Sequence, residues 1–302
     1  MKAILFAHLP GQEAGEPLTD IVFGRFSPSG HLPYSIPKKE NDYPESVSLR
    51  GYALGQVQDT FSEGLYIDYR WLNKAGIKAR YAFGHGLSYT NFSYSSLSLS
   101  KGMMLSTFPP ARIPKDTSSI PTYSNSTPSP QEAAFPTDLK RINRYLYPYL
   151  DNPAQYVTTK KYNYPEGYST TPKPDPRAGG GLGGNDALWD IVYTLSLTIT
   201  NTGSFAAKSV VQLYITHPSS SEFDTPVIQL RNFAKTKVLE AGESETVQLT
   251  LTRKDLSVWD TVAQDWKVPV LEGFRFWVGS ASDALTWGCD DGGSCGEKAS
   301  PV

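Results

Sequence analysis

The sequence contains very little cysteine and histidine. Its 302 residues include two cysteines and four histidines. The histidines, His8, His31, His85 and His217, lie in four separate predicted elements without metal-ligand spacing, so no metal site is expected. No Gly-x-Ser-x-Gly segment occurs, and neither cysteine has the context of a nucleophile. Serine and thiol hydrolysis are therefore unsupported.

The sequence also lacks a basic excess and any long apolar run. Lys and Arg number 28 against 30 Asp and Glu, a net charge of −2. Nucleic acid and anionic membranes are therefore not expected as partners. No run of 18 apolar residues exists, so no membrane-spanning helix is predicted. The apolar start ends at Pro10, too early for a signal peptide, and predicts a buried strand over residues 3–8. A chain that begins inside a core strand is expected to be part of a longer protein.

What the sequence does have is tyrosine (18 residues) and proline (23), with 12% aromatic residues, which favours β-rich and loop-rich structure. Residues 1–100 have an α/β pattern. It consists of the strand at 3–8, a helix from about 11 to 23 ended by Gly24, a short strand at 34–36, and mixed strand and turn at 63–71. A tight glycine turn over residues 81–90 then leads into a strand.

The remainder divides into two segments. Residues 101–186 are rich in Pro, Ser, Thr and Tyr and predict an irregular insertion and linker with one helix at about 137–150. Residues 187–302 predict an all-β sandwich. Its strands are expected over residues 189–201, 206–216, 226–239, 244–252, 262–270 and 272–280.

Two pairs of positions bear on secretion. Cys289 and Cys295 lie in a short loop that could close a disulfide, and two free thiols are the alternative. Asn91 and Asn125 each begin a glycosylation sequon. Together these features lean toward a secreted protein.

Two further patterns are read as structural. Gly179-x-Gly181-x-x-Gly184 has the spacing of a dinucleotide fingerprint, but it follows a proline-rich stretch and precedes β-structure, so it predicts a linker and no cofactor.

Carboxyl groups are the remaining candidates for catalysis. Glycoside hydrolysis with retention, for example, needs two of them about 5–5.5 Å apart. The candidates for that chemistry are all assigned structural roles: Glu13, Asp20, Glu63 and Asp68.

Four ordered motifs resemble those of glycoside hydrolase family 3 β-glucosidases: Leu9–Gly15 (LPGQEAG), Phe26–Pro33 (FSPSGHLP), Phe61–Arg70 (FSEGLYIDYR) and Phe83–Thr90 (FGHGLSYT). The resemblance implies the C-terminal part of an α/β sandwich domain, an insertion, and a fibronectin type III-like domain. It implies hydrolysis of terminal β-D-glucosyl residues with retention by a secreted parent enzyme. The substrate would bind only in the full-length enzyme, which has an N-terminal (β/α)8 barrel as intramolecular partner.

The family's nucleophile and acid/base motifs match no residue here, so no catalytic residue is carried over and the chain is expected to be inactive alone. Glu13, Glu63 and Arg70 match family positions expected to support the active site. Two alternatives stay open. One is a β-xylosidase of the same family, and the other is a carbohydrate- or protein-binding module that uses Trp259, Trp266 or Trp277.

Overall fold

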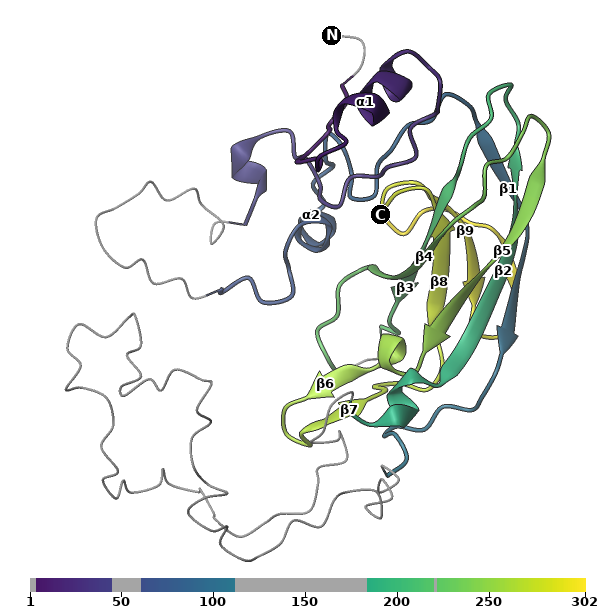
Figure 1. Cartoon of the computed structure of the whole chain (residues 1–302). Coiled ribbons are helices and arrows are strands. Elements are labelled where there is room, and N and C mark those ends of the chain that lie inside the picture. Colours follow the sequence, from purple (N-terminus) through teal and green to yellow (C-terminus); the bar gives the residue numbers. More distant parts are fainter. Residues whose placement is uncertain (1–3, 45–60, 112–183, 220–221) are drawn as a thin grey trace, which may run out of the picture. The chain divides into compact units, whose positions relative to one another are not determined.

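The structure of the chain is a computed structural model that describes residues 4–44, 61–111, 184–219 and 222–302 (Figure 1). These residues belong to one compact unit, formed by Met1–Arg112 together with Pro176–Val302. The predicted helix at 137–150 and the sequon at Asn125 lie outside the described residues. Within the described ranges, no helix is long and apolar enough to cross a membrane.

The larger part of the described chain is a sandwich of antiparallel strands, as residues 187–302 predicted. One sheet has the order β1-β2-β5, with strands Phe92–Lys101, Ile191–Asn201 and Ser244–Thr252. The other sheet has the order β10-β9-β8-β3-β4. In that order its strands are Cys295–Glu297, Leu285–Asp290, Arg275–Gly279, Val210–Thr216 and Gln229–Lys235.

The core lies between the inner faces of the two sheets. Alternate residues of β2 point inward and are fully buried, while the residues between them, such as Thr194 and Thr198, face outward. β3 is buried on both faces, because Val211, Leu213 and Ile215 face the core while Gln212 and Tyr214 contact Gly84 and Tyr69 of the N-terminal segment. The buried cluster includes Leu195, Leu197, Ile199, Leu213, Ile215, Leu249, Leu251, Phe274, Phe276 and Val278.

Most predicted sandwich strands are found, with one correction. The strand predicted over 262–270 is found only as the short β7 (Asp265–Lys267). It pairs in a small hairpin with β6 (Val258–Asp260), which was not predicted. Its turn is held by Asp260, whose carboxylate accepts from the backbone N–H groups of Val262 and Ala263. The strands β9 and β10 were not predicted.

The first sandwich strand comes from the segment that precedes the insertion. β1 pairs with β2 along its length, with a bulge between Ser95 and Ser98 where Ser96 has a φ of 54°. Residues 92–101, which precede the insertion, therefore lie in the same sheet as β2 and β5, which follow it.

The N-terminal segment is less regular than predicted. Its elements are α1 (Gly15–Val22), the 3₁₀ turn η1 (Glu40–Asp42) and α2 (Tyr69–Ala75). Two more 3₁₀ turns lie in the sandwich: η4 (Asp186–Trp189) and η5 (Lys254–Leu256). Gly24, with a φ of 73°, follows α1 as predicted.

Three strands predicted for this segment are not formed, although the turn predicted near residue 63 is present. Residues 4–8 form no strand, and Ile4, Leu5 and Phe6 are about half exposed, because no described strand lies beside them to pair with. Residues 34–36 contribute only a bridge from Ile36 to Tyr81. The stretch at 63–71 enters α2, which Gly76 ends with a φ of 65°.

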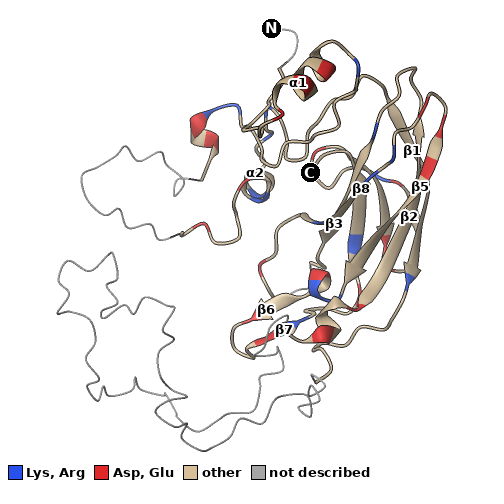
Figure 2. Cartoon of the chain, in the orientation of Figure 1, with Lys and Arg blue, Asp and Glu red and all other residues tan. Residues whose placement is uncertain are grey.

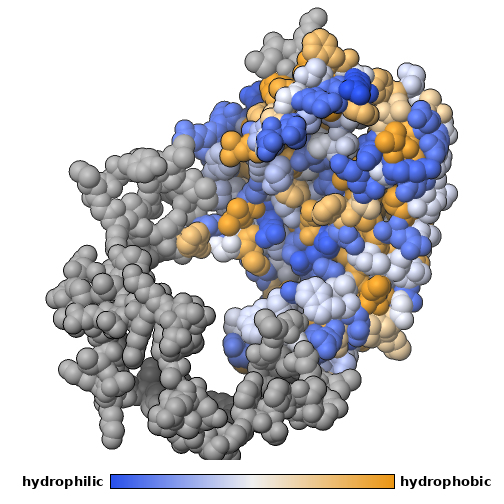
Figure 3. Space-filling model, viewed as in Figure 1, coloured by the Kyte–Doolittle hydropathy of each residue, from blue (hydrophilic) through white to orange (hydrophobic). Residues whose placement is uncertain are grey.

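Charge is evenly mixed over the described part of the chain (Figure 2), whereas apolar surface is concentrated at one end (Figure 3). Acidic and basic residues alternate over the described part without a large region of one sign, in agreement with the balanced composition (Figure 2). Apolar residues reach the surface at the end where α1 lies (Figure 3). α1 has no buried residue, and Val22 and Phe23 at its end are 61% and 83% exposed.

Candidate functional site

The glycine turn at residues 81–90 pairs with the earlier turn at residues 27–36. The backbone N–H of Gly84 donates to the carbonyl of Leu32 at 2.8 Å, and the N–H of Leu32 donates to the carbonyl of His85 at 2.9 Å. Gly84 has a φ of 79°, a conformation that favours glycine. Two sequence motifs that are 50 residues apart therefore form one structural unit.

His31 is held inside this unit. Its Nδ1 lies 2.5 Å from the carbonyl oxygen of Gly84. Because a carbonyl only accepts, Nδ1 carries the hydrogen. Burial lowers the pKa of His31, partly opposed by this hydrogen bond, while Lys235 and His85 lower the pKa further. His31 is therefore neutral at pH 7 and acts as a hydrogen-bond donor.

A cavity of about 480 Å³ lies beside the paired turns. It is lined by Ile4, Leu5, Phe6, His8, Ile21, Pro28, Ser29, Gly30, His31, Leu32, Tyr81, His85, Gly86 and Leu87. The lining contains three histidines and no carboxylate. The two opposed carboxyl groups that glycoside hydrolysis needs are therefore not supplied by the described walls of this cavity.

The four candidate carboxylates have separate surroundings. Glu13 is exposed, two residues before α1. Asp20 lies 3.2 Å from the guanidinium of Arg25. Asp68 accepts from the backbone N–H and the hydroxyl of Ser35 at 2.8 and 2.5 Å, and also from the backbone N–H of Tyr69. Asp20 and Asp68 are thus engaged in structural contacts.

Glu63 is half-buried, and its Oε2 has no hydrogen-bond partner among the described residues. Arg70 lies in α2 with its guanidinium carbon 5.8 Å from the ring centroid of Tyr69. No described hydrogen bond or ion pair joins Glu13, Glu63 and Arg70 to one another. Their supporting role in an active site stays a prediction.

The paired turns are attached to the sandwich by contacts that the sequence reasoning missed. The Gln212 amide nitrogen donates to the carbonyls of Gly84 at 3.0 Å and Ser280 at 2.7 Å. The backbone N–H of Ser282 donates to the carbonyl of Phe83 at 2.9 Å. The only signal of the first contact in the sequence is a glutamine inside the apolar run 210–215.

Tyrosines extend this attachment. Tyr69 of α2 accepts a hydrogen bond from the backbone N–H of Leu230 at 3.0 Å. Its ring packs on Phe83 and Tyr214 with centroid distances of 4.7 and 6.1 Å. Nearby, the Tyr66 hydroxyl donates to Asp224, which also lies 3.5 Å from the Lys74 amine. α2 is therefore bound to the loop and strands of the sandwich.

The three tryptophans considered for a binding site have different surroundings. Trp277 is buried, and its indole N–H donates to the hydroxyl of Thr216 at 2.9 Å, so it belongs to the core. Trp259 is 40% exposed and pairs across the β6–β7 hairpin with Trp266. The Lys254 amine lies 5.3 Å from the ring centroid of Trp266.

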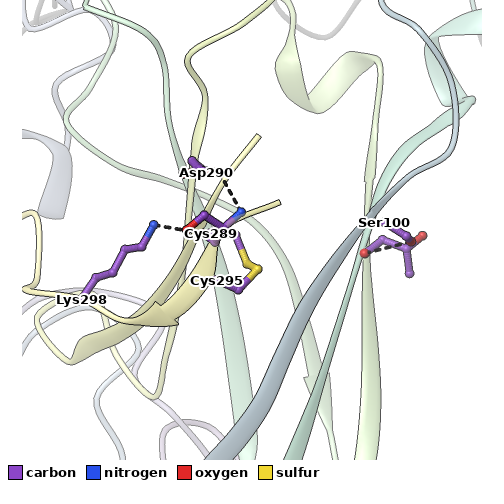
Figure 4. Close-up of a disulfide and its surroundings, with 7 residues drawn as sticks. Ser100, Cys289, Asp290, Cys295 and Lys298 are labelled. Atoms are coloured by element: carbon purple, nitrogen blue, oxygen red, sulfur yellow. Dashed lines mark hydrogen bonds between the residues drawn. A yellow bond between two sulfur atoms is a disulfide. The ribbon is translucent and has the colours of Figure 1, made fainter. Parts of the chain in front are cut away.

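Cys289 and Cys295 face each other in the register of β9 and β10 and form a disulfide (Figure 4). The amine of Lys298 donates to the carbonyl of Ser294 in the same hairpin at 3.2 Å. The sequon asparagine Asn91 is exposed just before β1. No group of His, Cys, Asp and Glu side chains in the described ranges could hold a metal ion.

Two family models match separate parts of the chain. Residues 1–89 match the model of the glycosyl hydrolase family 3 C-terminal domain, and residues 209–282 match the fibronectin type III-like domain. The probable beta-glucosidase F of Aspergillus flavus and that of Aspergillus oryzae are each 56% identical to the chain over 299 residues. Each match covers 98% of this chain and 34% of the relative, so the chain spans about a third of these relatives' length.

Solved structures agree with the sequence relatives. The beta-D-glucoside glucohydrolase of Trichoderma reesei is 32% identical, with a TM-score of 0.64, over 97% of this chain and 30% of that one. A glycoside hydrolase family 3 beta-glucosidase of Neurospora crassa is 32% identical, with a TM-score of 0.70, over 93% of this chain and 34% of that one.

Proposed function

Because this chain belongs to glycosyl hydrolase family 3, as its four motifs predicted, we propose that it is part of a β-glucosidase in which it positions groups and does not itself break the glycosidic bond. The proposed reaction of the whole enzyme is removal of terminal β-D-glucosyl residues with retention of configuration. The observation that carries the proposal is the 56% identity to probable beta-glucosidase F over 98% of the chain.

The geometry of the described part supports a positioning role. The walls of the cavity beside the glycine turn contain no carboxylate. Asp20 and Asp68 are engaged by Arg25 and Ser35. The paired turns are instead fixed by hydrogen bonds to one another and to the sandwich, which suits a wall that must hold its shape. A misplacement of about 1 Å in such a wall can reduce the rate about a hundredfold.

The test uses two proteins. The 302-residue chain alone should release no p-nitrophenol from p-nitrophenyl β-glucoside. A hybrid in which this chain replaces the matching 299 residues of the Aspergillus oryzae relative should release it. Activity of the isolated chain that disappears on Glu13→Gln or Glu63→Gln would contradict the positioning role. An inactive but folded hybrid would contradict the β-glucosidase assignment.

The substrate and the setting belong to the same proposal. We expect the hybrid to act on cellobiose and cello-oligosaccharides, and p-nitrophenyl β-xyloside tests the alternative that the enzyme is a β-xylosidase.

We also propose that the protein is a secreted glycoprotein. The exposure of Asn91 and the disulfide between Cys289 and Cys295 support this. Expression in a secreting fungus should give a mass that falls on Asn91→Gln or on treatment with an endoglycosidase.

A second candidate function is carbohydrate binding by the sandwich. The partly exposed Trp259 and its partner Trp266 favour it, because indole rings stack on sugar rings. Trp277 is excluded from such a site by its burial. Retention of the chain on cellulose or xylan should be lost in Trp259→Ala and kept in Val262→Ala, a change at an exposed residue of the same hairpin.

A further inference from the structure

The side chain of Gln212 makes three hydrogen bonds between the paired turns and the sandwich. It is 3% exposed and interrupts the apolar run 210–215 of β3. Its nitrogen donates to the carbonyls of Gly84 and Ser280 at 3.0 and 2.7 Å. Its oxygen accepts from the Tyr214 hydroxyl at 2.6 Å. These three bonds fix which end of the amide faces the turn.

The turn is shaped to receive this amide. A Cβ atom on residue 84 would lie 2.1 Å from the Gln212 oxygen, so any side chain there would displace the amide. The same Gly84 carbonyl that accepts from Gln212 also lies 2.5 Å from His31 Nδ1. One carbonyl oxygen therefore joins the sandwich, the glycine turn and the turn that carries His31.

We propose that Gln212 is a positioning residue, whose buried amide holds the glycine turn and, through it, the cavity wall formed by His31, His85 and Gly86. A donor is needed because the amide faces two carbonyl oxygens. Glutamine supplies two N–H groups without charge, which a carboxylate, an aliphatic side chain or a hydroxyl of that reach cannot do. The part of this inference that concerns catalysis rests on the proposed function.

Gln212→Glu gives the sharpest test because the two side chains have the same shape. An ionised carboxylate would face two carbonyl oxygens and repel them, whereas a protonated carboxyl can donate to one of them. The readout is hydrogen–deuterium exchange at the amides of Leu32, Gly84 and His85 in the whole chain, compared with the unmodified protein at each pH. Near pH 8 these amides should exchange at least about tenfold faster, and the difference should shrink toward pH 5.

Gln212→Met removes both donors at similar size and should show the faster exchange at every pH. Gln248→Glu, the same change at an exposed position of β5, should leave exchange unchanged. Tyr214→Phe removes only the bond to the Gln212 oxygen and retains both donor bonds, so it should give a smaller increase at the same three amides. Equal exchange rates in Gln212→Glu and Gln212→Met at all pH values would overturn the proposal. Faster exchange spread evenly over the sandwich would also overturn it.

The hybrid enzyme tests the catalytic part separately. In the hybrid, Gln212→Glu should lower kcat more than it changes KM, and activity should recover as the pH is lowered toward 5. Gln212→Glu could speed exchange at the turn and still leave the activity of the hybrid unchanged. That result would limit the role of Gln212 to the fold and overturn its positioning role in catalysis. If the unmodified hybrid is inactive, the proposed function fails and the exchange experiment still decides whether Gln212 holds the turn.

Discussion

The hydroxyl of Thr90 donates a hydrogen bond to the side-chain oxygen of Asn201 at 2.6 Å, and both residues are buried. Thr90 ends the glycine-turn motif, and Asn201 ends β2. The Asn201 amide nitrogen also donates to the carbonyls of Phe205 and Leu239 at 2.9 and 2.8 Å. One side chain thus joins the N-terminal segment to two loops of the sandwich.

Asn201→Ala should therefore destabilise the fold strongly. It would remove the hydrogen bonds of Asn201 to the hydroxyl of Thr90 and to the carbonyls of Phe205 and Leu239. The Leu239 carbonyl would still accept from the backbone N–H of Ala207, and the other two groups would lose their partner. Each such loss costs about 1–3 kcal/mol, so we expect the free energy of unfolding to fall by about 3 kcal/mol or more. Urea denaturation measures the free energy of unfolding.

Thr246→Ala is the control, because it removes only an exposed hydrogen bond to Thr198 and should cost below about 0.5 kcal/mol. Similar costs for the two changes would contradict the prediction.

Two glycines should respond to alanine for different reasons. A Cβ on residue 86 would lie 2.6 Å from the carbonyl oxygen of Gly30 and 2.9 Å from His31, so Gly86→Ala forces the paired turns apart. Gly242 has open space around it but a φ of 78°, so alanine there only strains the backbone. We expect a loss above about 2 kcal/mol for Gly86→Ala and about 1 kcal/mol for Gly242→Ala.

A second substitution at each site separates the two causes. Gly242→Asn should be milder than Gly242→Ala, because asparagine tolerates the left-handed region. Gly86→Asn should be no better than Gly86→Ala, because any Cβ meets the same backbone oxygen. Thermal unfolding of the four variants checks both statements, and recovery by asparagine at residue 86 would show that strain, not contact, acts there.

The sandwich was the most predictable part of the chain because its strands carry their own signal. Alternation in Leu195, Leu197 and Ile199 reports a strand with one buried face, and the turn at 201–203 marks where the strand ends. β9 and β10 were missed since glycine and polar residues interrupt the alternation, and the disulfide replaces part of the apolar packing there.

The N-terminal segment was less predictable for a physical reason. The apolar run at residues 4–6 has the composition of a buried strand, but a strand forms only beside a pairing partner, which composition does not report. The stretch before α2 looked strand-like because Tyr, Ile and Trp favour strands. The cap at Asp68 and the packing of Tyr69 on Phe83 outweigh that preference.

The candidate site was predictable as motifs and not as contacts. The glycines at 84 and 86 were expected to form a turn. Their neighbours Gln212 and His31 lie 128 and 53 positions from Gly84. No local pattern in one sequence reports such a pairing, so the link between the turn and the sandwich came only from the structure.

Stability should fall in acid because of His217. This residue is 4% exposed, and neither of its ring nitrogens has a hydrogen-bond partner among the described residues. Burial, together with the nearby positive charge of Arg231, lowers the pKa of His217 to about 4. The ring of Phe274 covers it at a centroid distance of 5.4 Å and offers no compensating charge.

The direction of this pH effect follows from the pKa of His217 in the unfolded and folded chains. The unfolded chain binds a proton near pH 6.5, and the folded chain resists it until about pH 4. The contribution of neutral His217 to stability is therefore complete above pH 6.5 and falls by about 3 kcal/mol as the pH drops to 4. His217→Phe should remove this dependence. The test compares urea unfolding of both proteins from pH 7 to pH 4, and a constant difference between them would contradict the prediction.

The apolar surface at α1 should make the chain associate with itself. Leu18 and Val22 lie one turn apart on α1 and are 44% and 61% exposed, and Phe23 is 83% exposed. Exposed apolar residues grouped in this way favour association, whereas single ones do not. Sedimentation velocity should show oligomers of the 302-residue chain that increase with concentration. The double change Val22→Gln and Phe23→Gln should shift the protein toward monomer, while Val262→Gln, at an isolated residue that is 94% exposed, should not. A chain that stays monomeric at all concentrations, or an equal effect of both variants, would rule out α1 as the cause.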